Sequence, residues 1–156
     1  MTHQYRPHVG DFSNIVCFKA VITGVEDTLG TDGAAVVFIR AGRVRGHSLA
    51  RELGVSHTAL PTPELAPLLN TALGASGTRL CAVTRSYEDA GRIIIEARET
   101  VCSAGEPQGS PRECTFTLGA VWGALEEITG RSYLGRHIAS VLRGSDTDTF
   151  EFTPLD

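Results

Sequence analysis

Apolar residues recur three and four positions apart through the first half of the chain, and at alternating positions through much of the second half. The first spacing is typical of helices that bury one stripe of side chains, and it predicts three helices before a glycine-rich segment at 74–77. The predicted helices cover residues 13–30, with Ser13 as the cap, 31–54 and 62–74.

The second half predicts two hairpins and one long helix. The strand pairs are expected at 79–85 with 92–101, and at 133–143 with 147–153. Between them, the capping box Ser110-Pro111-Arg112-Glu113 predicts the start of a helix that ends at Gly130. The sequence therefore predicts an α+β fold: three N-terminal helices, then hairpin, long helix and hairpin, with an antiparallel sheet packed on helices.

Length and charge narrow the class of protein. A chain of 156 residues that is 42% hydrophobic predicts a single domain over 1–156, with a helical part at 13–74 and the sheet and long helix at 78–154. A formal charge of -4 gives no general attraction for nucleic acid, and no apolar run is long enough to span a membrane. We therefore expect a cytoplasmic protein without a nucleic-acid partner. Its four scattered cysteines predict reduced thiols.

Cys114 is the first candidate for chemistry. The capping box would place it in the first turns of the long helix, where free N–H groups favour a thiolate that can be a metal ligand or a nucleophile. The alternative is a small buried hydrophobic residue. A cysteine hydrolase is less expected, because no local signature pairs Cys114 with His47, His57 or His137.

Two carboxylates and one basic stripe leave alternatives open. Glu99 and Asp148 share strand parity with apolar neighbours, so regular strands would turn both inward; otherwise Glu99 lies at a solvated strand end and Asp148 in the turn. A basic stripe at helical spacing is either an anion site or the solvated side of a helix. The stripe consists of Arg40, Arg43, His47 and Arg51.

The stretch from Cys114 to Gly123, CTFTLGAVWG, together with 126–131, resembles the 4-vinyl reductase domain family, also called hydrocarbon-binding proteins. The shared features are a cysteine before an aromatic residue, a small-residue helix with two spaced glycines, and a strand pair that ends in Phe-x-Phe. The resemblance covers 79–154. It implies a small-molecule-binding domain related in fold to TRAPP tethering subunits, with a hydrophobic pocket between helices and sheet. We expect the pocket to be lined by Phe116, Gly119, Ala120, Trp122, Gly123 and Phe38.

The resemblance also implies a metal site. Sensor members hold zinc through a cysteine before the long helix, then a glutamate and two cysteines in the final strand pair. In this chain Cys114 matches the first ligand, and His137, Ser140 and Asp148 stand at the others. Serine is not an ordinary zinc ligand, and strand parity places His137 and Asp148 on opposite faces. Zinc is therefore possible, but we favour loss of the site.

The leading hypothesis is a non-catalytic domain that binds or senses an apolar, aromatic or tetrapyrrole-like small molecule. The resemblance implies a homodimer formed through the first two predicted helices. A dimeric adaptor resembling tethering subunits is the alternative. A reductase of a tetrapyrrole vinyl group, or its accessory protein, ranks last because no nicotinamide or flavin motif is visible. The small glycine-rich strip of the long helix either leaves room for a ligand or lets another helix approach.

Overall fold

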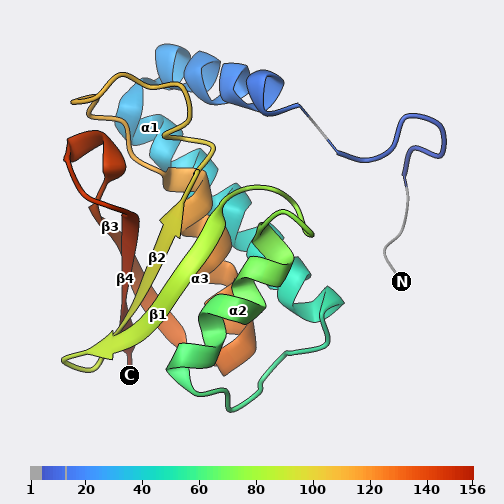
Figure 1. The fold of residues 1–156 in the computed structure, drawn as a ribbon, viewed down its shortest axis with the longest axis vertical. Coiled ribbons are helices and arrows are strands. Elements are labelled where there is room, and N and C mark those ends of the chain that lie inside the picture. The colour runs from blue at the N-terminus through green and yellow to red at the C-terminus, as the bar shows by residue number, and fades with distance from the viewer. Residues whose placement is uncertain (1–4, 13) are drawn as a thin grey trace.

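The computed structural model describes residues 5–12 and 14–156, and it consists of one antiparallel sheet with helices on one face (Figure 1). The sheet has the strand order β1-β2-β4-β3. Helices α2 and α3 cover its inner face, and α1 lies against α3 on the side away from the sheet. The helices are α1 (Ile15–Glu52), α2 (Thr62–Leu73) and α3 (Thr115–Thr129), with a short 3-10 turn, η1 (Val141–Arg143); the strands are β1 (Ala82–Asp89), β2 (Arg92–Arg98), β3 (Ser132–Ala139) and β4 (Asp148–Leu155).

The expected α+β class is confirmed, and the helix count differs from the expected one because the first two predicted helices run together as α1. Helical geometry is interrupted at Gly30, where φ is 76° and ψ is 168°, and it resumes at the next residue. Gly30 thus interrupts helical geometry at the predicted position, in a backbone conformation that glycine adopts without a steric penalty. Asn14 caps α1 by accepting a hydrogen bond from Val16 N, while the predicted cap, Ser13, lies outside the described residues.

Four glycines let α1 and α3 cross closely. A Cβ added at Gly42 would lie 2.8 Å from Ala120 N, and one added at Gly123 would lie 2.8 Å from Arg43 Cα. Gly46 and Gly119 meet backbone of the opposite helix in the same way. The glycines of α3 therefore allow α1 to approach closely, and they do not leave room for a ligand.

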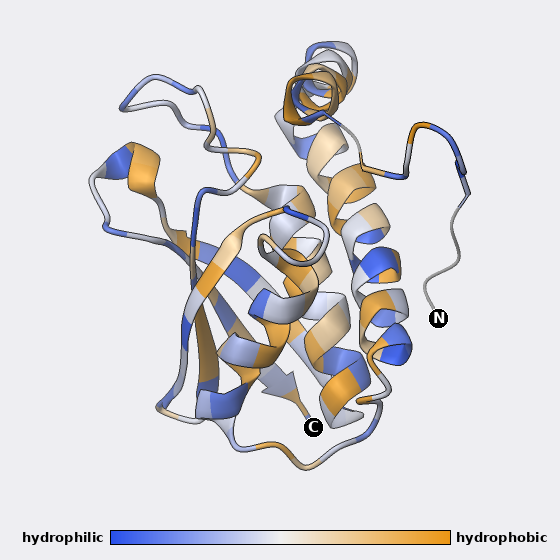
Figure 2. Cartoon of the chain, turned by 45° about the vertical axis from the view of Figure 1, so that its right-hand side comes forward, coloured by the Kyte–Doolittle hydropathy of each residue, from blue (hydrophilic) through white to orange (hydrophobic). Residues whose placement is uncertain are grey.

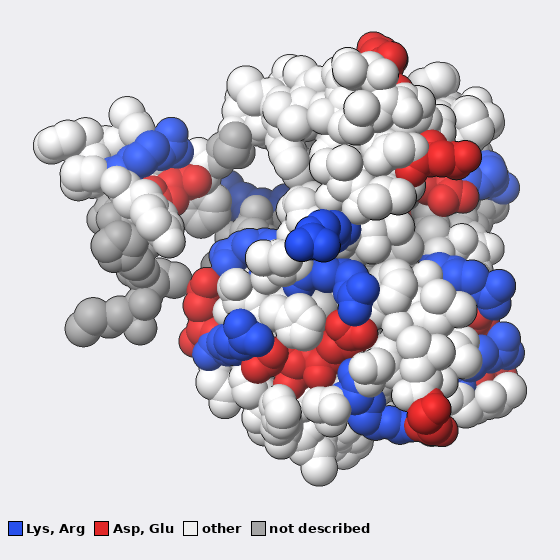
Figure 3. Space-filling model, turned by 180° about the vertical axis from the view of Figure 1, so that it is seen from behind, with Lys and Arg blue, Asp and Glu red and all other residues white. Residues whose placement is uncertain are grey.

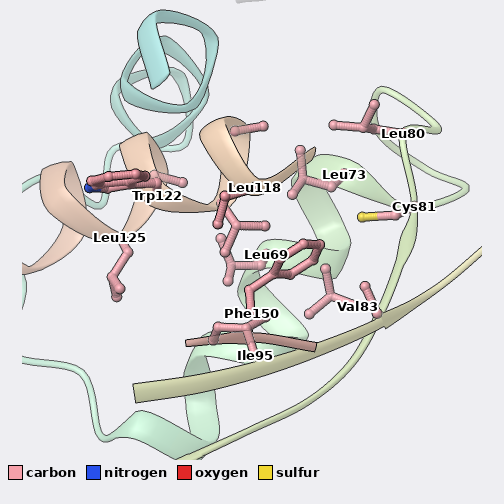
Figure 4. Close-up of a cluster of buried hydrophobic side chains, with 14 of the residues drawn as sticks. Leu69, Leu73, Leu80, Cys81, Val83, Ile95, Leu118, Trp122, Leu125 and Phe150 are labelled. Carbon is pink, nitrogen blue, oxygen red and sulfur yellow. The ribbon is translucent and has the colours of Figure 1, made fainter. Parts of the chain in front are cut away.

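The core lies between the sheet and the helices α2 and α3. Ile95 and Phe150 point from neighbouring strands toward Leu69 of α2 and Leu118 of α3, and all four are almost completely buried (Figure 4). This interior is filled by side chains. The resemblance implies a pocket between helices and sheet, and these four side chains occupy the part of that space between the central strands and the helices α2 and α3.

Several predicted boundaries are corrected. Helix α3 begins at Thr115, and Ser110 Oγ accepts a hydrogen bond from Arg112 N in a preceding turn instead of capping the helix. The first hairpin reaches its turn only at 90–91, so the segment predicted as a turn is mostly β1. The strand β3 ends at Ala139, and η1 follows it. Glu99 lies exposed just beyond β2 with a φ of 52°, as in the solvated alternative.

Candidate functional site

A hollow of about 620 Å³ opens between α1, the first turns of α3 and the segment that joins α2 to β1. Its deepest lining residues are Leu49, Leu73 and Ala120, which are almost completely buried. This volume lies within the range of roughly 300–1,000 Å³ that is usual for small-molecule sites. The remaining lining residues are Phe12, Asn14, Ile15, Phe18, Arg45, Thr78, Arg79, Leu80, Val101 and Phe116.

The kink in α1 shapes the hollow, because residues from both sides of Gly30 line it. Phe18 precedes the kink, and its ring packs edge-on against that of Phe116, with the centroids 5.1 Å apart. Leu49 follows the kink and lies on the opposite part of the same helix. A straight helix would not bring these two walls to one space.

The structure separates the six residues expected to bind a ligand. Phe116 and Ala120 lie in the lining of the hollow. Gly119 and Gly123 pack against the backbone of α1, as described above. Trp122 faces the other way: its ring lies 4.5 Å from Arg43 Cζ and packs edge-on against Phe152. Phe38 is buried in the core.

A buried polar cluster gathers the three residues expected to hold a metal. Ligand atoms of Cys114, His137 and Asp148 all lie within 4.8 Å of one another, and His137 Nε2 is 3.3 Å from Asp148 Oδ1. Thr100 Oγ1 and Ser103 Oγ donate to Asp148 Oδ2 at 2.8 and 2.9 Å. Asp148 is the first residue of β4 and does not lie in the turn. Of the two carboxylates that the sequence predicted could point inward, Glu99 and Asp148, only Asp148 is buried.

Strand register explains why the parity argument against this cluster is wrong. His137 pairs with Phe150 across β3 and β4, and directly paired residues of antiparallel strands share a face. Asp148 lies two residues before Phe150 and shares that face too. The imidazole of His137 packs on the ring of Phe150, with the centroids 5.1 Å apart. His137 and Asp148 therefore meet beneath the sheet.

The donor set fits a zinc ion. Within the described chain, His137 Nε2 is buried and has no aligned hydrogen-bond partner, although a thiol and a carboxylate lie beside it. One nitrogen, one sulfur and one oxygen ligand suit tetrahedral zinc with one open position. Cys114 N–H donates to His137 Nδ1 at 3.4 Å, so zinc at Nε2 would require a proton on Nδ1 and the loss of this long hydrogen bond.

Hydrogen bonds and burial set the charges in the cluster. Burial alone would raise the pKa of Asp148, but the nearby His137 imidazole and hydrogen bonds from Thr100 and Ser103 outweigh it and hold that pKa below its usual range. Burial would lower the pKa of His137, and the nearby carboxylate of Asp148 outweighs it and raises that pKa instead. The metal-free cluster thus holds Asp148 as a carboxylate beside an imidazole of raised pKa.

The thiol favoured by the helix N-terminus is Cys102, not Cys114. The pKa of Cys102 is lowered by a hydrogen bond from the Cys114 thiol, against the effect of burial, and by the amides of Thr117 and Phe116. The same thiol contact, together with burial, raises the pKa of Cys114. Burial raises the pKa of Cys81 to about 12. The prediction chose Cys114 because it placed this residue inside the first turns of the helix. In the structure α3 begins only at Thr115, so Cys114 is the residue before the helix.

Part of the basic stripe of α1 faces carboxylates of α3, so it is not an open anion site, while Arg40 and Arg51 are exposed as in the solvated alternative. Arg43 forms an ion pair with Glu126 at 2.9 Å. Arg51 and His47 both lie 3.0 Å from Glu127, whose side chain is nearly buried. Figure 3 shows acidic and basic side chains gathered side by side on this side of the molecule.

Some site residues escaped the sequence reasoning. Thr100, Ser103 and Arg79 belong to irregular segments without periodicity, and only their place in the fold reveals their contacts. A signal existed for Cys102, since a second thiol lies close in sequence to Cys114.

No family model and no curated protein sequence matches the chain, whereas solved structures do. The phenol-responsive sensory domain of the transcription activator PoxR, solved with phenol, has a TM-score of 0.66 and 20% identity over 92% of this chain and 76% of that one. A trafficking protein particle complex subunit 3 from Naegleria fowleri, covalently bound to palmitic acid, has a TM-score of 0.56 and 15% identity over 92% of this chain and 98% of that one. At these identities the likeness shows the fold alone. The chain thus has the fold shared by a sensory domain and a trafficking subunit, and none of its described helices is long and apolar enough to cross a membrane.

Proposed function

We propose that this protein is a non-catalytic domain that binds or senses an apolar or aromatic small molecule in the hollow beside α1. The observation that carries the proposal is an apolar space of about 620 Å³ lined from two parts of a bent helix and from α3. The phenol-binding domain of similar fold supports it. An assignment to the 4-vinyl reductase domain family is part of this proposal and rests on the residues 114–131 and the shared fold.

Filling the hollow tests the proposal. Val101→Phe adds a ring to a lining residue, whereas Val9→Phe makes the same change at an exposed position outside α1 and is the matched control. Binding stabilises a folded protein by about 2.7 kcal/mol at a ligand concentration of 100 times Kd. We therefore expect phenol or other small aromatic compounds to raise the Tm of the wild type and of V9F, but not that of V101F.

The proposal also predicts bound material in the purified protein. Native mass spectrometry should show an organic mass that denaturation removes and that V101F lacks. It would be refuted if a panel of phenols, alkanes and tetrapyrroles left the Tm unchanged and no bound mass were found.

We also propose that Cys114, His137 and Asp148 hold a zinc ion that keeps one open position and joins the loop before α3 to the last strand pair. Zinc supplies a rigid cross-link between its ligands when bound. Elemental analysis should find about one zinc per chain in the wild type, by the stoichiometry of such sites. Cys114→Ala should lose it, and Cys17→Ala, which changes an exposed thiol, should not. A wild type without zinc, and without a Tm increase on adding zinc, contradicts this part.

A homodimer through α1 is the further part of the proposal. Apolar side chains that are about half exposed or more lie along this helix, and a shallow hollow runs over its segment before the kink. Figure 2 shows the hydrophobic positions along the ribbon of α1. Contiguous apolar surface of this kind marks an interaction site. Val21→Glu should yield a monomer in light scattering coupled to gel filtration, whereas Val9→Glu should leave the mass unchanged. The exposed apolar residues of α1 are Ile15, Val16, Val21, Leu29, Val36, Val37 and Val44.

The adaptor is the second candidate function, favoured by the same exposed face of α1 and by the trafficking subunit of similar fold. An adaptor needs the surface and not the hollow. V101F should then leave its partner contacts intact while Val21→Glu disrupts them, which is the reverse of what a ligand sensor requires.

A further inference from the structure

The lining of the hollow carries an imbalance of charge. Two arginines, Arg45 and Arg79, belong to it, and no aspartate or glutamate does. The whole chain has a formal charge of -4, so the hollow is positive where the average surface is negative. Such a local field concentrates anions.

The two arginines differ in how far their charge is already neutralised. Arg45 Nη1 lies 2.9 Å from Glu52 Oε1. Arg79 makes no ion pair within the described part of the chain: its Nε donates to Ala75 O at 3.3 Å, and its guanidinium lies 5.2 Å from the ring centre of Phe12. The hollow therefore presents one uncompensated positive charge, held by Arg79.

The inner part of the lining is apolar. It includes the side chains of Leu49, Leu73, Val101 and Phe116. Arg79 is exposed and Leu73 is fully buried, so charge lies at the outer part of the space and apolar surface at the inner part. This polarity matches a molecule with an apolar body and a charged end.

We propose that the ligand of this hollow is an amphipathic monocarboxylate, with its apolar body between α1 and α3 and its carboxylate on Arg79. A guanidinium presents its N–H groups in a fork that suits two carboxylate oxygens. One free positive charge balances a monoanion, whereas a phosphate monoester would keep an excess negative charge. This inference rests on the proposed function, because it names the class of ligand that the same hollow accepts.

Matched ligands and matched variants test the inference. Binding of decanoate, decanol and decylamine to the full chain is measured by isothermal titration calorimetry, below the micelle concentration of each. Arg79→Gln removes the charge and leaves a shorter polar side chain, Arg79→Lys keeps the charge, and Arg98→Gln removes an exposed arginine outside the lining. Unchanged Tm values show that the variants fold.

We expect the wild type to bind decanoate about tenfold more tightly than decanol, since a hydrogen bond to a charged group has that order of effect. Arg79→Gln should remove this preference and leave decanol binding nearly unchanged, Arg79→Lys should retain part of it, and Arg98→Gln should behave as the wild type. Decylamine should bind most weakly.

Two other outcomes overturn the inference in distinguishable ways. Equal binding of decanoate and decanol, unaffected by Arg79→Gln, would leave the apolar hollow as a binding site and refute its preference for a carboxylate. A wild type that binds neither compound nor any phenol, with V101F behaving identically, would overturn the proposed function as well.

Discussion

The close crossing of α1 and α3 makes a quantitative prediction for Gly123→Ala. The added Cβ would overlap the carbonyl oxygen of Arg43, the nearest atom, and would lie 2.8 Å from Arg43 Cα, whereas carbon atoms pack comfortably at about 3.5–4.0 Å. The obstacle is helix backbone, which cannot rotate aside as a flexible side chain could. The helices must therefore separate locally by at least about 1 Å, a gap large enough to forfeit a quarter to a half of each nearby dispersion contact.

The cost follows from two opposing effects. Overpacking of this kind destabilises by about 1–3 kcal/mol, and a backbone obstacle favours the upper end. Replacing glycine by alanine inside a helix returns about 0.5–1 kcal/mol. We expect a net loss of about 2 kcal/mol, which corresponds to a fall in Tm of about 4–8 °C for a chain of this size. Urea unfolding followed by circular dichroism measures the change.

Gly24→Ala is the control, because it makes the same chemical change inside α1 where a new Cβ meets nothing within 4 Å. It should raise the free energy of unfolding by about 0.5–1 kcal/mol. Since Gly24 lies on the face proposed for the dimer, both variants are measured at two protein concentrations. If Gly123→Ala were as stable as the wild type, or more so, the glycine crossing would not be a close contact and the reasoning would fail.

Further predictions concern the charged groups. Hydrogen bonds from Arg51, Ser56 and His47 lower the pKa of Glu127 to about 2 from an ordinary 4.5, so its contribution to stability is complete above pH 4.5 and lost as the pH falls toward 2. Glu127→Gln should flatten this acid limb in urea midpoints measured against pH, and an unchanged limb would contradict the assignment. Asp148→Asn should cost about 3 kcal/mol, because it leaves buried His137 without its anionic partner. Asp146→Asn, at an exposed position two residues away, should cost almost nothing, and equal losses in the two variants would argue against a special role for the cluster.

Elements with strong local signals were predictable from the sequence. The helix α2 begins at Thr62, has Pro63 in its first turn and ends at Leu73, just before Gly74, nearly as predicted, because proline and glycine act through their own backbone restrictions. Gly130 ends α3 in a left-handed conformation for the same reason. The presence of four antiparallel strands also followed from alternation alone.

Other features depended on contacts between distant segments. Gly30 was expected to end a helix and does interrupt the helical geometry, but the direction in which the second segment of α1 continues is set by packing against α3, which the local sequence does not contain. The position of Cys114 before α3 depends on a turn that the capping box only imitates. Whether His137 and Asp148 meet depends on the register between β3 and β4, which single-strand parity does not contain.

The position of the hollow could not be predicted from the sequence. Glycine and alanine on α3 could equally leave space or admit a neighbour, and the sequence offered no way to decide. The neighbour of the α3 glycines is the second part of α1, while the space is enclosed by both parts of α1, the first turns of α3, Val101 and the segment before β1. A family resemblance pointed to a pocket, yet its walls come largely from residues outside the stretch that carries the resemblance.

The bend at Gly30 divides α1 into two segments that line the same hollow. Phe18 lies in the first segment and Leu49 in the second, while Val21 and Leu29 lie on the outer side of the first segment. Ion pairs from Lys19 to Glu106 and from Arg112 to Glu26 join the first segment to the loop before α3. A ligand that moves the two segments apart would tilt Val21 and Leu29 relative to the rest of the molecule, so ligand binding would change the shape of the surface without any catalytic step.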